Sequence, residues 1–568
     1  MDAELAVLAR GEGRTKLRLG ELLDALFLRE GHHELGFSSI DAYVIERVRQ
    51  SAAWGRQARG VARRLREKQL DRVRGATVSG DLSWSKTELL CRHATSEGEV
   101  ALLNEAMGST VRALKTRLEG ADSEREEASH ARVSKVVPVN ATEVAMLMAS
   151  RTMVSYLVGR QVGDEAFVEA LLAEAETSLQ RLGHEDRRGL IHAVDLDALE
   201  EALGAIASTH ARTARPEAPA PAPAERRFEP LSAAPAPGTL RGIDDEIVQL
   251  SQALARRNLE LGHLLKDFRA ARAWARLGYA SLAAYARERL GLSLSSVEHR
   301  MTLARAAARH PVLGEALCAG DIGYEAGLLV AQVLGRSGSE ALALCWVERA
   351  RRRTIKHLRE EVRAVLQAAQ LRPGVSRRPP DDEDLEAVRS LEEKILDGEP
   401  LRGFLGSAGP GPQESITLAV PSELGPASHA LRFRISRDLA LYAGRVEAEF
   451  RRWAPPTASF VGFLCTNFWQ TWLPCLEAFD SRWKRVFRRD LHACRSPVCE
   501  RRDVTPHHLV FRAHGGSDDA SNMVSLCSWC HLEGVHEGRL TATGTANHMT
   551  WRLGRDPWLE VRGRDRTV

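Results

Sequence analysis

Aromatic side chains are scarce in this 568-residue chain, at 5% of all residues, and long apolar runs are missing. No uninterrupted apolar stretch approaches the ~20 residues that a membrane-spanning helix needs. The N-terminal residues Met1-Asp2-Ala3-Glu4 carry acids where a secretory signal peptide carries positive charge. We therefore expect a cytoplasmic protein without a membrane partner.

A large excess of charge of one sign is also lacking. The chain has 79 lysines and arginines against 76 acidic residues, which gives a formal net charge of +3 at pH 7. The chain as a whole is therefore not a polycation, and any surface that binds a nucleic acid must be local.

Cysteine is infrequent, with nine residues, four of which cluster near the C-terminus. The other five stand in apolar, helix-like contexts, which favour small buried hydrophobic residues over a disulfide framework. A reducing compartment fits this usage. These five are Cys91, Cys318, Cys345, Cys465 and Cys475.

Alanine, leucine and arginine dominate the composition, which is typical of helices. Hydrophobic residues make up 44% of the chain and charged residues 27%, as in ordinary globular proteins. The chain is too long for one core, and a length of ~150 residues per domain predicts about four domains.

An internal repeat organises most of the chain. Leu19-Gly20 recurs as Leu261-Gly262, and Gly36 recurs as Gly278; 261 − 19 and 278 − 36 both give an offset of 242. The offset falls to 240 further along, and the pattern extends over a hundred residues. Its later members are Ser79–Trp84 with Ala319–Tyr324 at the offset of 240, and Thr110–Leu114 with Thr354–Leu358, for which 354 − 110 gives 244.

Short alternating segments follow each copy, at Val133–Val139 and Leu431–Ser436, and each predicts a strand before a helix. A Pro/Ala-rich stretch at 215–238 predicts a semi-extended linker between the halves. The predicted units are helical copies at 1–125 and 241–370, strand–helix modules at 126–210 and 429–480, linkers at 211–240 and 371–428, and a C-terminal domain at 481–560.

Each copy contains the outline of a helix-turn-helix. In the second copy an amphipathic helix at Ser281–Leu290 precedes the turn Gly291–Ser293, whose serine suits a helix N-cap. In the first copy the turn is Arg49–Ser51, and its second helix is rich in cations that could meet phosphates on one face. An arginine-rich solvated helix is the equally weighted alternative. The cations are Arg56, Arg59, Arg63, Arg64, Arg66 and Lys68.

Four cysteines near the C-terminus have the spacing of a metal site. Cys494 and Cys499 form one close pair, and Cys527 and Cys530 form the other. Four thiolates suit a tetrahedral zinc ion, and such a closed site is structural because no ligand position stays open. Zinc-finger peptides gain roughly 10–16 kcal/mol from such binding.

Histidines and an asparagine lie between and beside these pairs: His507-His508, Asn522, His531 and His536, with Gly515-Gly516 in the intervening loop. The combination resembles the HNH endonuclease family, whose ββα-metal fold hydrolyses phosphodiester bonds. Helical modules ahead of it are similar to the uncharacterised domains that precede HNH domains in bacterial proteins. The expected fold class is therefore mainly α, with duplicated helix-turn-helix-like modules, small strand–helix segments and a C-terminal ββα-metal domain.

The resemblance implies a role for each residue. His507 would ligate a catalytic divalent metal (Mg²⁺, Mn²⁺, Ni²⁺ or Zn²⁺), and His508, on the opposite face of the strand, would be the general base. Asn522 would pin the loop that orients His508. His531 would be the second metal ligand. His536 is a further ligand candidate, although residues five apart lie ~140° apart on a regular α-helix, so that helix must bend or end.

The approach to these residues is locally basic, as contact with a phosphate backbone requires. A solvated charged face is the alternative interpretation. The candidate nucleic-acid-binding residues are Arg482, Lys484, Arg485, Arg488, Arg489, Arg501, Arg502 and Arg512.

We therefore expect an endonuclease that acts on double-stranded DNA, with a structural zinc ion, one catalytic divalent metal and no small-molecule cofactor. The alternative is a DNA-binding or regulatory protein whose HNH fold is a zinc-stabilised binding module. A third possibility, a nickase, depends on the oligomeric state, which the sequence leaves open.

Overall fold

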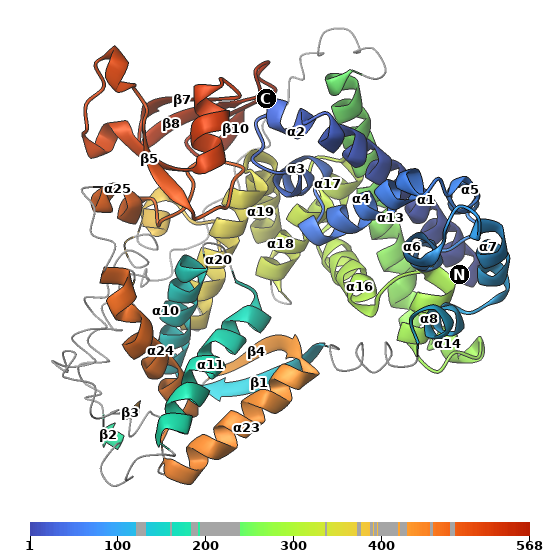
Figure 1. The fold of residues 1–568 in the computed structure, drawn as a ribbon, viewed down its shortest axis with the longest axis horizontal. Helices are drawn as coiled ribbons and strands as arrows, with labels where there is room; N and C mark the ends of the chain where they lie inside the picture. The colour runs from blue at the N-terminus through green and yellow to red at the C-terminus, as the bar shows by residue number, and fades with distance from the viewer. Residues whose placement is uncertain are drawn as a thin grey trace.

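A computed structural model of the chain describes residues 1–120, 132–158, 162–182, 191–193, 239–335, 338–371, 377–386, 390, 395, 418–420, 429–454, 458–477 and 483–567. The described part is mainly helical, as predicted (Figure 1). Nearly all of the predicted linker at 211–240 and most of that at 371–428 lie outside the described residues. No helix in the described part is long and apolar enough to cross a membrane.

The two helical copies contain the same succession of helices. The first consists of α1 (Asp2–Leu28), α2 (Gly31–Glu34), α3 (Ile40–Tyr43), η1 (Val44–Val48), α4 (Ala52–Glu67), α5 (Asp71–Ser79), α6 (Trp84–His93), α7 (Glu99–Gly108) and α8 (Val111–Glu119). The second consists of α13 (Leu240–Ala270), α14 (Ala273–Arg276), α15 (Leu282–Tyr285), η2 (Ala286–Leu290), α16 (Leu294–Arg309), α17 (Pro311–Ala319), α18 (Tyr324–Leu334), α19 (Glu340–Arg352) and α20 (Ile355–Leu371).

Serine caps begin the second helix of each helix-turn-helix outline. Ser293 accepts a hydrogen bond from the Ser296 amide at 3.2 Å, and Ser51 accepts one from the Trp54 amide at 3.3 Å. The predicted helix at Ser281–Leu290 begins one residue later, with Ser281 as its cap, and its last five residues form a π-helix.

Close backbone approaches explain the repeated Leu-Gly pair. A β carbon on Gly20 would lie 2.4 Å from the Ala58 carbonyl oxygen, and one on Gly262 would lie 2.3 Å from that of Arg300. In both copies, glycine therefore lets the first long helix cross the helix after the turn at short range.

The copies pack on each other with reciprocal contacts, as the subunits of a twofold dimer do. The Tyr43 hydroxyl of the first copy donates to Asp244 of the second at 2.7 Å. In return, the Tyr285 hydroxyl of the second donates to Asp2 of the first at 2.8 Å. Arg47 also pairs with Asp244, and Arg289 also pairs with Asp2. The offset of 242 relates each residue of one contact to its counterpart in the other. The two copies therefore form, within one chain, an interface in which both sides use the same residues.

Helix capping is reciprocal as well. Glu46 accepts a hydrogen bond from the Ile355 amide at 2.7 Å, and Glu288 accepts one from the Val111 amide at 2.5 Å. Each glutamate thus caps the last helix of the opposite copy, where a carboxylate also suits the helix dipole.

The two strand–helix segments, predicted as separate modules, come together. β1 (Arg132–Val139) pairs antiparallel with β4 (His429–Ser436). The helices α10 (Ala141–Leu157), α11 (Asp164–Leu182), α23 (Arg437–Trp453) and α24 (Phe460–Glu477) share one apolar core with these strands. A single strand leaves its backbone groups unpaired, so the two segments complete each other. A small parallel pair, β2 (Ile191–Ala193) and β3 (Leu418–Val420), is separate.

The C-terminal domain begins with α25 (Lys484–Arg489). It continues with β5 (Val504–His508), η3 (Arg512–His514), η4 (Ala520–Asn522), β6 (Met523–Cys527) and the π-helix η5 (Trp529–His536). β5 pairs antiparallel with β6, so the predicted ββα core is present.

A four-stranded sheet that we did not predict follows this core. Its strands are β7 (Leu540–Thr545), β8 (His548–Leu553), β9 (Leu559–Arg562) and β10 (Asp565–Thr567), in the order β10-β9-β8-β7. Alternating buried residues Met549, Trp551 and Leu553 carry its pattern.

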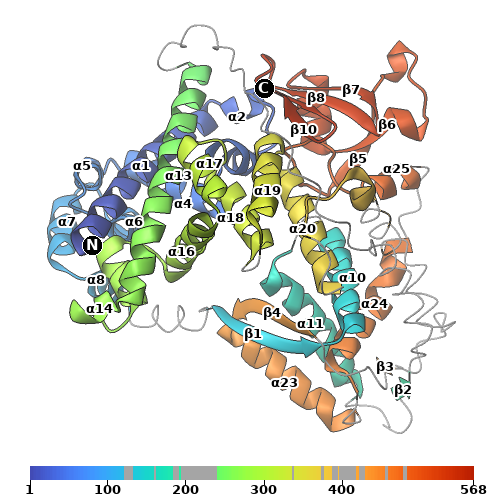
Figure 2. The same ribbon diagram turned by 180° about the vertical axis from the view of Figure 1, so that it is seen from behind.

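The C-terminal domain shares a core with both helical copies. Residues of α1, α3 and α13 pack in one apolar cluster with the cysteines and the sheet. The Trp558 indole donates to the Leu35 carbonyl at 2.8 Å, and Arg539 pairs with Glu34 at 3.0 Å. Gly36, with a φ of +84°, lets the backbone approach Arg539 and Gly554. Figures 1 and 2 show this domain beside α2 and α19.

The scattered cysteines divide by burial. Cys91 and Cys465 are buried, as predicted, and Cys345 is half-buried. The prediction was wrong for Cys318, which is exposed near the end of α17. The side chain of Cys475 lies outside the described residues.

We expect Asp244→Asn to lower the free energy of unfolding by about 3–5 kcal/mol, because Asp244 is buried and the change leaves the half-buried Arg47 without its counter-charge. The matched change in the other copy, Asp2→Asn, should cost less than about 1 kcal/mol, because the Asp2–Arg289 pair is partly exposed. Urea unfolding followed by tryptophan fluorescence measures both, and equal losses would contradict this assignment.

Candidate metal centre

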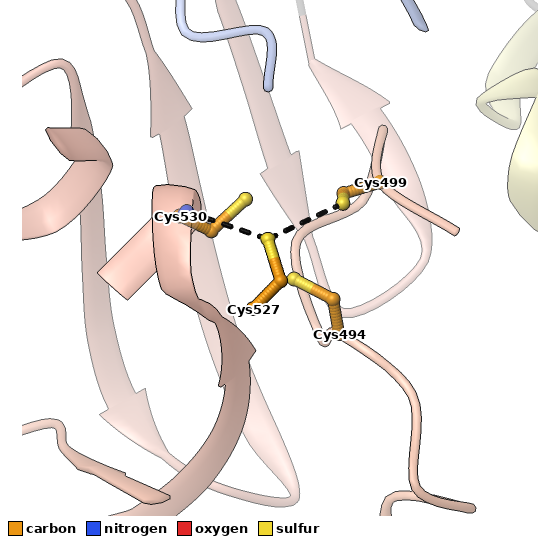
Figure 3. Close-up of side chains that lie close together, drawn as sticks. All are labelled: Cys494, Cys499, Cys527 and Cys530. Atoms are coloured by element: carbon orange, nitrogen blue, oxygen red, sulfur yellow. Dashed lines mark hydrogen bonds between the residues drawn. The ribbon is translucent and has the colours of Figure 1, made fainter. Parts of the chain in front are cut away.

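The four predicted cysteine ligands converge. Cys494, Cys499, Cys527 and Cys530 are all buried, and their sulfur atoms lie within 4.8 Å of one another. Figure 3 shows Cys494 and Cys499 on a loop, Cys527 at the end of a strand and Cys530 on the following helix. This arrangement fits a tetrahedral zinc site.

Hydrogen bonds around the sulfurs support the same interpretation. The Cys530 amide donates to the Cys527 sulfur at 3.4 Å, and the Ser38 hydroxyl, from the first helical copy, donates to the Cys499 sulfur at 3.3 Å. Hydrogen bonds from neighbouring thiols hold the pKa of Cys499 well below its usual value, while burial raises that of Cys494. Such donors favour thiolate, the form that binds a metal.

Three histidines form a second cluster in the ββα core. The candidate ligand nitrogens of His507, His531 and His536 lie within 4.8 Å of one another. His507 lies on β5, whereas His531 and His536 lie on η5. The structure therefore brings together all three residues that the resemblance assigned to a catalytic metal.

The spacing of His531 and His536 is explained by the type of helix. Residues 529–536 form a π-helix, in which hydrogen bonds join residues five apart. Positions 531 and 536 therefore face the same side, and the expected bend is replaced by a wider turn. Gly534 allows close packing, because a β carbon there would lie 2.8 Å from a methyl group of Leu540.

The surroundings of the cluster leave a ligand atom free. His507 is 2% exposed, and its Nε2 is buried without a hydrogen-bond partner among the described residues. Burial, with His531 and His536 nearby, lowers the pKa of His507 to about 3, so its ring is neutral. The Thr505 hydroxyl lies 2.8 Å from Nδ1 of His531, which leaves Nε2 of that ring for a metal. Neutral imidazoles with one nitrogen free fit a divalent transition metal.

His508 faces away from this cluster, as alternation along a strand requires. Its Nε2 lies 2.8 Å from Oδ1 of Asp518, which also pairs with Arg512. Hydrogen bonds from Arg512 and His508 lower the pKa of Asp518 to about 2, so this carboxylate is ionised. An ionised partner at Nε2 keeps the proton there and leaves Nδ1 as the basic nitrogen.

Asn522 ties down the loop between β5 and η4. Its Oδ1 accepts from the Val510 amide at 2.8 Å, and its Nδ2 donates to the carbonyls of Val510 and Ser517. Gly515 has a φ of +82°, which glycine adopts readily. Gly516 supplies space, since a β carbon there would lie 1.8 Å from the Val510 carbonyl oxygen.

The predicted nucleic-acid residues differ in their surroundings. Arg485 is exposed, while Arg489 is tied to Asp490 and to the carbonyls of Ala520 and Met523. Arg502 donates to the Leu491 carbonyl. Arg501 and Arg512 form exposed pairs with Asp503 and Asp518. Arg488 is half-buried. Arg482 and the side chain of Lys484 lie outside the described residues.

Three site residues escaped the sequence analysis: Thr505 at His531, Asp518 at His508, and Phe511, which stacks on His536 with ring centroids 5.2 Å apart. Thr505 precedes His507 by two positions on a strand, and this same-face spacing could have identified it. Asp518 lies in a polar loop, where sequence spacing carries no such signal.

The family comparison agrees with this geometry. Residues 492–534 match the family model described as HNH endonuclease, and this region of the chain is an HNH domain. No curated protein and no solved structure matches the chain.

We expect the purified protein to retain about one equivalent of zinc per chain after dialysis, held by the four cysteines. Cys499→Ser should lose this zinc and destabilise the C-terminal domain, because metal binding and folding of such sites are coupled. Elemental analysis measures the zinc. Cys318→Ser, which changes an exposed cysteine, is the matched control, and zinc retention by Cys499→Ser would refute the assignment.

Proposed function

We propose that this protein is a metal-dependent endonuclease that hydrolyses phosphodiester bonds of DNA at its HNH domain. The convergence of His507, His531 and His536 beside a strand that presents His508 on its other face carries the proposal. A closed zinc site alone would serve a binding module, but such a module needs no second cluster of histidines.

Each group has a defined task in hydrolysis. A divalent ion on His507, His531 and His536 would stabilise the negative charge that develops on the phosphate and the leaving oxygen. Nδ1 of His508 accepts the proton of the attacking water. Asp518 holds the tautomer of His508 that leaves Nδ1 free, and the loop tied by Asn522 keeps Asp518 in place.

Phosphate binding falls to the arginines around the site. The side chains of Arg501 and Arg512 are about half exposed, and each is neutralised by one exposed carboxylate. An exposed ion pair is worth little, so a phosphate can replace Asp503 at Arg501 at small cost, and a phosphate can bind Arg512 while Asp518 stays on His508. Arg489, which supports the backbone of η4 and β6, instead stabilises the site.

We expect plasmid DNA to be cleaved in the presence of Mg²⁺, Mn²⁺, Ni²⁺ or Zn²⁺, and His508→Ala to lower the rate about 10²–10⁴-fold, since it removes a general base. His548→Ala, which changes an exposed histidine of the β7–β8 hairpin, is the matched control. Gel electrophoresis follows the products. Equal cleavage by wild type and His508→Ala, or none with any metal, would refute the nuclease. DNA binding without cleavage would favour the binding-module alternative.

A further expectation concerns the order of products. One HNH site cuts one strand at a time, so nicked circles should accumulate before linear plasmid. Linear DNA without a nicked intermediate would mean that two chains act together.

A further inference from the structure

A basic hollow lies on the first helical copy, outside the HNH domain. It has a volume of about 500 Å³ and is formed by α4 and α6. Five arginines line it, against one glutamate, Glu88, and Gly60 leaves part of its wall without a side chain. The arginines are Arg56, Arg59, Arg63, Arg64 and Arg92.

Two of these guanidinium groups lack a counter-charge. Within the described part of the chain, neither Arg59 nor Arg64 forms an ion pair with a carboxylate, whereas Arg56 pairs with Asp41 and Arg92 pairs with Glu88. The hollow therefore carries uncompensated positive charge. Two other cations of α4 are engaged elsewhere: Arg66 pairs with Asp24, and Lys68 donates to backbone carbonyls of α6 and its C-cap.

The second copy shows that the fold does not need these arginines. At the offset of 242, Arg59 corresponds to the buried Met301 and Arg64 to Ala306. Arg56 corresponds to Glu298, and at the offset of 240 Arg92 corresponds to Gln332. The same helices form in both copies, so packing alone does not account for the basic hollow.

A continuous series of ring contacts joins the hollow to the HNH domain. The Arg59 guanidinium lies 3.9 Å from the ring centroid of Phe27, which stacks on His32 at 5.7 Å. His32 contacts His33 at 4.0 Å, and His33 stacks on Trp529 at 4.8 Å. Trp529 begins η5, the helix that carries His531 and His536. The hollow is thus held at a fixed position relative to the histidine cluster.

We propose that this hollow binds backbone phosphates of the DNA that flanks the cleavage site. The inference rests on the proposed nuclease function for the identity of that DNA, whereas phosphate binding follows from the free guanidinium groups. Arg59 and Arg64 contact phosphate oxygens and release counterions from the duplex. Such contacts position DNA without reading its sequence.

The test measures binding separately from cleavage. A fluorescent DNA duplex is titrated with His508→Ala protein, without added catalytic metal, at several salt concentrations. Adding Arg59→Ala and Arg64→Ala should weaken binding about tenfold or more. The slope of the logarithm of the binding constant against the logarithm of the salt concentration (the salt slope) should fall in magnitude by about two, because two phosphate contacts are lost. Arg59→Lys with Arg64→Lys should retain most of the slope.

The second copy supplies the control. Arg305 corresponds to Arg63 and is exposed, so Arg305→Ala with Arg309→Ala removes the same charge from the equivalent helix. These changes should leave the affinity within about twofold. In the cleavage assay with His508 intact, the Arg59 and Arg64 variants should raise the DNA concentration for half-maximal rate and leave the saturated rate unchanged.

Each outcome decides between the proposals. An unchanged affinity and slope in the double alanine variant, an equal loss in the second-copy control, or binding of nucleotide or inorganic phosphate but not of duplex would overturn the inference. Thermal unfolding shows whether the double alanine variant loses affinity because it is misfolded. In that case the double lysine variant is used instead. If that variant is folded but has lost the salt dependence of DNA binding, the inference is also overturned. Hollow-dependent DNA binding without cleavage would uphold the hollow and refute the nuclease.

Discussion

The apolar core that α1, α3 and α13 share with the C-terminal domain is the constraint on which the rest depends. The HNH segment alone is too short to bury a sizeable core. It obtains one from its zinc-type cysteine cluster, its four-stranded sheet and helices of both copies. Ser38, Leu35 and Glu34 form hydrogen bonds with its side chains. The histidine cluster therefore has a fixed position on the helical scaffold.

The π-helix is the local counterpart of this constraint. A regular α-helix would place His531 and His536 on different sides, and only one of them would face His507. The wider turn aligns both, and Gly534 lets the helix approach β7 closely enough to pack. π-helical turns often occur at functional sites because they rearrange side chains that a regular helix would separate.

The sequence was sufficient for those parts of the molecule that depend on local spacing. Helical composition, the repeat, the serine caps and the four cysteines follow from residue type and periodicity. Asn522 forms hydrogen bonds with Val510 and Ser517 in the loop where the sequence placed it, and its role in orienting His508 stays a prediction.

Features that depend on long-range partners were out of reach. Whether β1 pairs with β4 or with another strand depends on how the two halves meet, and no local pattern encodes it. The same holds for Asp518 at His508 and for the ring series from Phe27 to Trp529. It also holds for Arg489, whose cationic sequence context suggested phosphate binding, although its partners are Asp490 and two backbone carbonyls. The C-terminal sheet differs, because its alternation at Met549, Trp551 and Leu553 was present in the sequence and was overlooked.

The reciprocal contacts of Tyr43 with Asp244 and of Tyr285 with Asp2 have an evolutionary consequence. In a homodimer, every substitution appears twice, and a DNA target tends to mirror the symmetry of the protein. Here the two halves are joined in one chain, so each accumulates changes independently. Four of the five arginines that line the hollow in the first copy correspond to other residue types in the second copy. A palindromic target is therefore not imposed on this protein by its architecture.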